Sequence, residues 1–198
     1  MLLIFDFDGT IADSLETFIV IANKHFKTSF TKREVRSKGT ITLIKELRIP
    51  KLLLPLYILR ARREVRPIIP LLNTFKDIPM AIRKLGRAHD LAIITTNSKI
   101  NVYKFLRKQK IESFFAYIDD SLAYEGKDKK ITRLINKCGY SKNDCAYIGD
   151  ESRDIHAAKI AEVTSVAVTW GYESRGLLRN AHPDKIVNSP QELTLLFK

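Results

Sequence analysis

Two aspartates on either side of a single phenylalanine follow the first apolar run of the chain and could carry out acid–base or nucleophilic chemistry. They are Asp6 and Asp8, in the segment Asp-Phe-Asp-Gly-Thr at residues 6–10. Two carboxylates at this spacing form a negative pocket that suits a hard cation. One can attack phosphorus while the other transfers protons. Gly9 permits a close backbone turn, and Thr10 can fix that turn by hydrogen bonding. The alternative is an acidic turn that only ends a strand.

A second acidic group lies in the segment Gly-Asp-Glu-Ser-Arg-Asp at residues 149–154. Residues four apart at the start of a helix lie on one side of it, so Asp150 and Asp154 can both face a metal ion. Magnesium favours such a site, because a few carboxylate oxygens leave room for water and a substrate phosphate in its octahedral shell. The residues alone leave two alternatives open: Glu151 competes with Asp154, and an isolated Gly-Asp often only caps a helix.

Hydroxyl, amide and basic side chains in two further segments could hold a phosphoryl group. Thr95, Thr96 and Asn97 come directly after the apolar run Leu91–Ile94. A hydroxyl and backbone N–H groups at such a strand-to-helix turn can bind phosphoryl oxygens. A lysine from Gly-Lys-Asp-Lys-Lys, residues 126–130, could neutralise the transferring group and keep clustered carboxylates ionised. The alternative for residues 95–97 is that they only start a helix. The alternative for the lysines of residues 126–130 is a solvated charge run.

The elements that must position these residues are six short apolar runs that end in polar or acidic residues. Most are separated by amphipathic stretches of helical period. Nearly continuous apolar strands that alternate with helices predict a parallel sheet covered on both faces, and hence an α/β core of three layers. Ligands bind such sheets at the carboxyl ends of the strands, beside a topological switch point. The runs are Leu2–Phe5, Leu91–Ile94, Phe115–Ile118, Ala146–Ile148, Val166–Val168 and Ile186–Val187.

A long segment between the first two runs indicates an insertion. About 80 residues separate these runs, far more than one crossover helix needs. Ser14 is a candidate cap for a helix at the start of the insertion, and Thr31 is a candidate start for another. We expect residues 14–78 to form a small, mostly helical cap domain, and residues 1–13 and 79–198 to form the core.

In this order, the segments resemble the haloacid dehalogenase superfamily over the entire chain. Phosphatases of that superfamily carry Asp-x-Asp-x-Thr after the first strand, Thr or Ser after the second, Lys before the fourth and an acidic pair after the fourth. The resemblance implies a Rossmann-like core with a helical cap inserted after the first strand. An acid at the position of Asp8 is typical of the phosphatases and phosphomutases, and not of the dehalogenases or ion-pumping ATPases. The loop Thr-Trp-Gly-Tyr, residues 169–172, is similar to one in phosphoglycolate-phosphatase-like members.

The resemblance also implies the catalytic roles. Asp6 would be the nucleophile that becomes transiently phosphorylated, and Asp8 would be the general acid and base. The family places the phosphate-binding hydroxyl immediately before the asparagine, which selects Thr96 over Thr95 and adds the backbone of Asn97.

The same resemblance implies the basic group and the metal ligands. Lys127 fits the family pattern better than Lys129, and Asp154 matches the second acid of the family better than Glu151. Lys127 would stabilise the phosphoryl oxygens. The implied Mg²⁺ ligands are Asp6, Asp8 through its backbone carbonyl, Asp150 and Asp154.

We therefore expect a Mg²⁺-dependent phosphatase that hydrolyses a small phosphate monoester through an aspartyl-phosphate. The runner-up is a phosphomutase of the same superfamily. A third reading is a binding protein, because residues 24–66 carry 13 Lys or Arg against 3 Asp or Glu in a chain of net charge +12. Such a segment could bind an acidic partner or nucleic acid, for which phosphate contacts alone could supply the affinity. The complete catalytic set argues against that reading, so we do not expect a nucleic-acid partner.

The remaining composition predicts a cytoplasmic protein. No apolar run reaches the about 20 residues of a membrane span, and the first residues do not form a secretory signal. Cys138 and Cys145 match no metal or redox motif and are expected to be free thiols in a reducing cytosol. The run Leu52–Leu59 could be an interface or part of the cap core, so the oligomeric state stays open.

Overall fold

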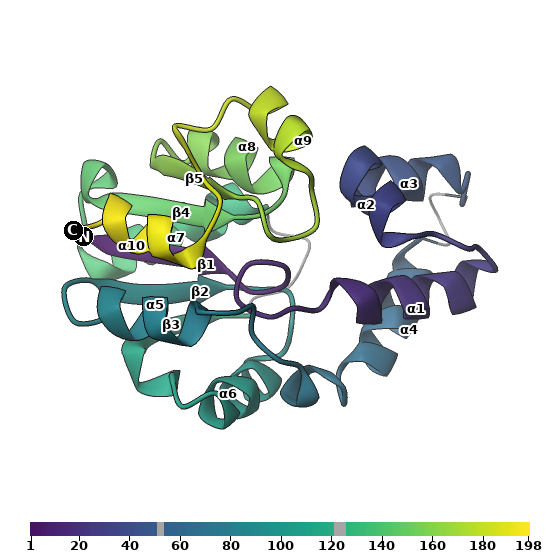
Figure 1. Ribbon diagram of the computed structural model, residues 1–198, viewed down its shortest axis with the longest axis horizontal. Coiled ribbons are helices and arrows are strands. Elements are labelled where there is room, and N and C mark those ends of the chain that lie inside the picture. The colour runs from purple at the N-terminus through teal and green to yellow at the C-terminus, as the bar shows by residue number, and fades with distance from the viewer. Residues whose placement is uncertain (51–53, 121–125) are drawn as a thin grey trace.

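A six-stranded parallel sheet forms the centre of the described part of the protein (Figure 1). The computed structural model describes residues 1–50, 54–120 and 126–198. The strand order is β3-β2-β1-β4-β5-β6, so the direction of winding reverses at β1 and β4 and creates a switch point between them. The strands are β1 (Leu2–Asp6), β2 (Asp90–Ile94), β3 (Phe115–Asp119), β4 (Cys145–Gly149), β5 (Thr164–Val168) and β6 (Lys185–Val187).

Alternate residues of β1 face two different helical layers. Leu3 and Phe5 belong to one hydrophobic cluster, Leu2 and Ile4 belong to another, and all four are fully buried. Double burial explains why the strands are apolar at every position rather than at every second one. The first layer contains α5 (Ile78–Leu85), α6 (Lys99–Lys108) and α10 (Pro190–Leu196), and the second contains α7 (Lys127–Cys138), α8 (Ser152–Ile160) and α9 (Arg175–Asn180).

The predicted three-layer α/β fold is confirmed. Each of the six apolar runs lies within a strand, and every pair of neighbouring strands is parallel. The strands begin or end up to two residues beyond the predicted runs, because polar residues such as Asp6 and Asp119 still pair with the neighbouring strand.

Four helices between β1 and α5 lie together beyond the carboxyl ends of the strands (Figure 1). They are α1 (Leu15–Phe26), α2 (Lys32–Lys38), α3 (Thr40–Glu46) and α4 (Leu54–Val65), and we call them the helical insert. A 3₁₀ turn, Ile69–Leu71, leads back to the core. The helical content of this segment agrees with the expectation, whereas the division into domains at residues 14 and 78 stays a prediction.

The two predicted helix starts differ in how they are capped. The Thr31 hydroxyl accepts a hydrogen bond from the Glu34 N–H, and the Glu34 carboxylate accepts one from the Thr31 N–H, which forms a capping box. Ser14 occupies the N-cap position of α1, but its side chain makes no capping bond. Its backbone is already helical there, and its hydroxyl lies 2.9 Å from the Tyr172 hydroxyl instead.

Surface and cysteine features fit the remaining expectations only in part. Within the described ranges, no helix is both long and apolar enough to cross a membrane. Cys138 and Cys145 are free thiols, as predicted.

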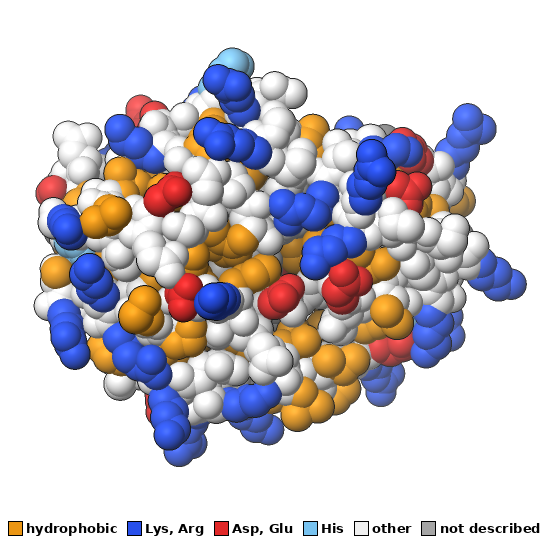
Figure 2. Space-filling model, viewed as in Figure 1, with side chains coloured by type: hydrophobic (Ala, Val, Ile, Leu, Met, Phe, Trp, Pro, Cys, Tyr) orange, Lys and Arg blue, Asp and Glu red, His pale blue; other side chains and the backbone are white. Residues whose placement is uncertain are grey.

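Lys and Arg side chains are spread over both the core and the helical insert on the face shown in Figure 2, rather than gathered over the insert alone. The run Leu52–Leu59 lies partly outside the described residues.

The layered core predicts a strong contrast between two isoleucines. Ile93 of β2 is 0% exposed, so Ile93→Ala should lower the free energy of unfolding by about 2–5 kcal/mol through lost burial and a residual cavity. Ile100 of α6 is 68% exposed, so the control Ile100→Ala should change it by less than about 0.5 kcal/mol. Urea unfolding followed by circular dichroism measures both. Equal effects would contradict the assignment of β2 to the buried centre of the sheet.

Candidate active site

Three buried carboxylates meet where the carboxyl ends of β1 and β4 lie side by side. Asp6 ends β1, and Asp150 and Asp154 follow β4 at the start of α8. One oxygen from each lies within 4.8 Å of the others. Parallel pairing of β1 with β4 explains why residues 144 positions apart in the chain converge at this edge. The structure thus brings together three of the four residues predicted to hold a metal.

Both oxygens of Asp150 are held by specific donors. The Thr10 hydroxyl donates to Oδ1 at 2.7 Å, and the Tyr172 N–H donates to Oδ2 at 2.7 Å. The Asp-x-Asp-x-Thr turn approaches this carboxylate closely: Gly9 has a φ of +78°, and a Cβ there would lie 2.1 Å from Asp150 Oδ2. The Thr10 hydroxyl therefore fixes the acid that directly follows β4.

Asp154 and Glu151, the two alternatives for the second acid, face different ways. Asp154 belongs to the carboxylate group, and its Oδ2 accepts a hydrogen bond from the Glu151 N–H at 3.1 Å. The Glu151 carboxylate instead accepts hydrogen bonds from Thr40 of the helical insert and from Arg153, whose Nε lies 2.8 Å away. Asp154 therefore lies in the three-carboxylate group, whereas Glu151 contacts the helical insert.

Lys127 lies against two of the acids. Its Nζ is 3.0 Å from Asp6 Oδ2, and it also forms an ion pair with Asp154 Oδ1. Burial alone would lower its pKa, but the charges of Asp154 and Asp6 raise the pKa of Lys127 well above its usual value, so the ammonium group stays protonated. Lys129, the alternative, is exposed to solvent. Of the two candidates, the structure places Lys127 beside the acids.

Asp8 lies apart from the three-carboxylate group and contacts the second predicted segment. Its Oδ2 accepts a hydrogen bond from the Asn97 side chain at 2.5 Å, and its Oδ1 is buried without a hydrogen-bond partner among the described residues. Thr95 is buried, and its hydroxyl accepts from the Asn97 N–H at 3.0 Å. Thr96 is exposed. One threonine hydroxyl is therefore engaged within the turn, while the other faces solvent.

The carboxylates are buried with too little positive charge to compensate them. Burial raises the pKa of Asp6 to about 7 against the opposing charge of Lys127, and burial raises the pKa of Asp8 to about 6. Burial, followed by the charges of neighbouring acids, raises the pKa of Asp150 well above its usual value. A cation bound among these oxygens would remove that penalty, and an all-oxygen donor set suits Mg²⁺. The residues present therefore fit a magnesium site.

Sequence reasoning missed the contacts that the helical insert makes with this site. Arg36 of α2 donates to backbone carbonyls of the loop at residues 169–171, and Thr40 of α3 donates to Glu151. It also gave no role to the Tyr172 N–H, which holds Asp150. No motif signals Arg36 or Thr40, because their partners lie more than 100 positions away in the chain.

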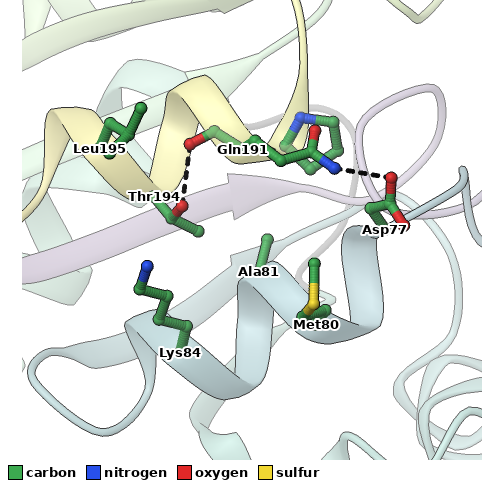
Figure 3. A pocket seen from close by; sticks show the side chains of 8 residues that line it. Asp77, Met80, Ala81, Lys84, Gln191, Thr194 and Leu195 are labelled. Atoms are coloured by element: carbon green, nitrogen blue, oxygen red, sulfur yellow. Dashed lines mark hydrogen bonds between the residues drawn. The ribbon is translucent and has the colours of Figure 1, made fainter.

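A cavity of about 230 Å³ lies away from the acids, between α5 and α10 (Figure 3). The Gln191 side chain closes one end with a hydrogen bond to Asp77 at 2.6 Å, and Thr194 donates to the Gln191 carbonyl at 2.8 Å. None of the predicted site residues is among those that line it: Asp77, Met80, Ala81, Lys84, Pro190, Gln191, Thr194 and Leu195.

Known proteins resemble this chain in both sequence and fold. A phosphoglycolate phosphatase of Synechococcus elongatus is 30% identical over 199 aligned positions, covering 96% of this chain and 94% of the relative. A pyrophosphatase of Oceanobacillus iheyensis is 22% identical and covers 96% of this chain and 94% of that protein. A solved haloacid dehalogenase-like hydrolase of Streptococcus pneumoniae superposes with a TM-score of 0.83 at 21% identity, covering 100% of this chain and 98% of its own.

The family itself is shown by a match along most of the chain. Residues 3–168 match the family described as haloacid dehalogenase-like hydrolase. This range includes the Asp-x-Asp-x-Thr turn, the helical insert, Lys127 and the three buried carboxylates. The expected resemblance is therefore confirmed. The chain belongs to the haloacid dehalogenase-like hydrolase family and is an enzyme of its phosphoglycolate-phosphatase-like branch.

Proposed function

We propose that this enzyme is a Mg²⁺-dependent phosphatase that hydrolyses a small phosphate monoester through a phosphorylated Asp6. The observation that carries the proposal is the placement of Asp6 between a lysine and two other acids. Its carboxylate shares a 4.8 Å group with Asp150 and Asp154 and lies 3.0 Å from Lys127 Nζ. A nucleophile, oxygen ligands for a cation and a fixed positive charge thus occupy one buried corner, as phosphoryl transfer requires.

Asp6, Asp150 and Asp154 would hold Mg²⁺ through their carboxylates, with the backbone carbonyl of Asp8 as a further oxygen. Bound there, Mg²⁺ would neutralise charge on the phosphoryl group and orient it for in-line attack. The buried position of these acids and the raised pKa of Asp6 and Asp150 support this assignment.

The chain's own residues would then perform two proton transfers and two displacements at phosphorus. An Asp6 oxygen attacks phosphorus, and the alcohol departs with a proton from Asp8. Asp8 next removes a proton from water, whose oxygen attacks the phosphorus of the aspartyl-phosphate and frees Asp6. A pKa of about 6 suits Asp8 for both roles near neutral pH. Its Oδ1, which has no hydrogen-bond partner among the described residues, is available to the transferred proton.

Phosphoryl oxygens would be bound by the Thr96 hydroxyl, the Lys127 ammonium group and the Asn97 N–H, which would exchange its bond to the Thr95 hydroxyl for one to phosphate. The Asn97 side chain would hold Asp8 in place, which its 2.5 Å hydrogen bond supports. The helical insert would act as a cap at residues 14–78 that excludes water and contacts the rest of the substrate. Its position beyond the carboxyl ends of the strands supports that role (Figure 1).

The substrate we propose is a small phosphorylated metabolite in the cytoplasm. Phosphoglycolate heads the candidates because a 30% identical relative is a phosphoglycolate phosphatase, and pyrophosphate follows because a 22% identical relative is a pyrophosphatase. Release of inorganic phosphate from a panel containing both, with Mg²⁺ present, ranks them. Retention of phosphate on a sugar product would identify the phosphomutase alternative. Salt-sensitive nucleic-acid binding without hydrolysis would favour the binding protein.

Replacing the two leading acids should separate the nucleophile from the proton-transfer group. Asp6→Asn should abolish turnover, because an amide cannot form the aspartyl-phosphate. Asp8→Asn should reduce kcat by about 10²–10⁴-fold, the usual scale for a general acid or base. The exposed Asp13 of the same loop supplies the control Asp13→Asn, which should retain activity. Phosphate release by folded variants measures all three, and an active Asp6→Asn protein would refute the mechanism.

The two adjacent threonines should differ when each loses its hydroxyl. Thr96→Val should lower kcat/KM by about 10–100-fold, because a hydrogen bond to a charged group is worth about 1.5–3 kcal/mol. Thr95→Val should have the smaller effect, since the Thr95 hydroxyl accepts from the Asn97 N–H within the turn. Steady-state kinetics on the best substrate compares them. A larger loss in Thr95→Val would transfer the phosphate-binding role to Thr95.

Magnesium binding should release protons below neutral pH. Because the pKa of metal-free Asp6 is raised to about 7, its carboxyl group is mostly protonated at lower pH and must ionise to bind a cation. The apparent affinity should therefore rise with pH until about pH 7 and level off above it. Calorimetry in two buffers of different ionisation enthalpy counts the protons released. Buffer-independent heats, with an affinity that does not change with pH, would contradict a protonated site.

A further inference from the structure

The backbone turns three carbonyl oxygens toward one arginine in the loop that follows β5. Arg36 of α2 donates from NH2 to the Thr169 carbonyl at 2.8 Å and from NH1 to the Trp170 carbonyl at 3.2 Å. NH1 also donates to the Gly171 carbonyl. Three convergent carbonyl dipoles repel one another unless a cation lies among them. A planar guanidinium group with five donors fits them, whereas the ammonium group of lysine is a point charge that does not.

The same loop is in contact with the acid that ends β4. The Tyr172 N–H donates to Asp150 Oδ2 at 2.7 Å, and the Trp170 indole N–H donates to the Thr10 carbonyl at 3.0 Å. Gly171 fills the remaining space, because a Cβ there would lie 2.2 Å from Asp150 Oδ2 and 2.3 Å from the Gly9 carbonyl. There is no room for a side chain at Gly171, and a shift of this loop would disturb the hydrogen bond from Tyr172 that holds Asp150 Oδ2.

Arg36 also joins α2 to the core as a hydrogen-bond acceptor, through its backbone. Its own carbonyl accepts a hydrogen bond from the Ser174 N–H at 2.7 Å. Four residues later, the Thr40 hydroxyl donates to Glu151, the residue that follows Asp150. The side chain of Arg36 thus holds residues 169–171, and its backbone carbonyl holds Ser174. The insert makes a second contact with the acidic turn through Thr40 and Glu151.

We propose that Arg36 is a positioning residue that couples docking of the helical insert to the metal site through Asp150. When α2 is docked, the guanidinium group fixes the carbonyls of residues 169–171, and the loop holds Asp150 Oδ2 through the Tyr172 N–H. Docking of the insert and binding of Mg²⁺ then favour each other, because coupling between two sites is reciprocal. The inference rests on the proposed metal site and goes beyond it, since Arg36 contacts none of the three carboxylates directly.

The test measures Mg²⁺ binding to the substrate-free protein by calorimetry. Arg36→Ala should bind Mg²⁺ about 10–100-fold more weakly, the range typical of residues that orient a metal ligand. Arg33, which is exposed on the same helix, supplies the matched control, and Arg33→Ala should bind like the wild type. Arg36→Lys should recover only part of the affinity. Unchanged affinity in folded Arg36→Ala would overturn the inference, even if its KM for substrate rises.

Chemical rescue separates positioning from a general loss of stability. Adding about 50 mM guanidinium chloride, far below the molar concentrations that unfold proteins, should restore part of the Mg²⁺ affinity of Arg36→Ala, and NaCl at the same concentration should not. Trp170, the only tryptophan of the chain, reports the loop directly. Its fluorescence should respond to Mg²⁺ in the wild type and lose that response in Arg36→Ala. A response that persists unchanged, or equal effects of the two salts, would count against Arg36.

Different results would show that the proposed phosphatase activity is wrong and that the proposed coupling through Arg36 is wrong. A wild type that binds Mg²⁺ through an Arg36-dependent loop but hydrolyses no phosphate ester would refute the phosphatase and support the coupling. A wild type that hydrolyses phosphate esters with full Mg²⁺ affinity in Arg36→Ala would support the phosphatase and refute the coupling.

Discussion

Mutual repulsion among three buried carboxylates is the constraint around which the site is organised. Asp6, Asp150 and Asp154 bring oxygens within 4.8 Å of one another at the junction of β1 and β4. Their surroundings supply hydrogen-bond donors rather than a matching number of cations: a hydroxyl from Thr10 and backbone N–H groups from Tyr172 and Glu151. These donors fix both oxygens of Asp150 and one oxygen of Asp154 without neutralising them. A cation bound among the three carboxylates, as proposed above, would supply the missing positive charge.

Lys127 supplies positive charge beside two of the three carboxylates. One ammonium group contacts Asp6 and Asp154 and lies 5.8 Å from the centre of the buried Tyr147 ring. It compensates part of the negative charge of the acids. It does not offset the cost of burial, because burial still raises the pKa of Asp6 to about 7 against the charge of Lys127. A second lysine at this place would stabilise the metal-free protein and weaken its affinity for the cation.

The sequence predicts the parts of this arrangement that depend on strand ends and fails where partners are backbone groups. Asp6 and Asp150 could be placed together because parallel strands bring their carboxyl ends to one edge. The contact of Glu151 with the helical insert could not be predicted, because Thr40 is 111 positions from Glu151 and belongs to no motif. Arg36 could not be found at all, because the carbonyls of residues 169–171 are present in any sequence, and only the folded loop turns them toward one point.

The order of the strands along the chain has a consequence for how the enzyme is made. β1 is synthesised first, yet its sheet partners begin at Asp90 and Cys145. Contacts between segments so far apart form late, because the entropy of closing long loops must be overcome before they add stability. On the ribosome, the strand that bears Asp6 therefore waits for most of the polypeptide to emerge. Of the two donors that hold Asp150, Thr10 emerges early and Tyr172 comes later still. The three carboxylates can therefore assemble only after the segment that contains Tyr172 has been synthesised.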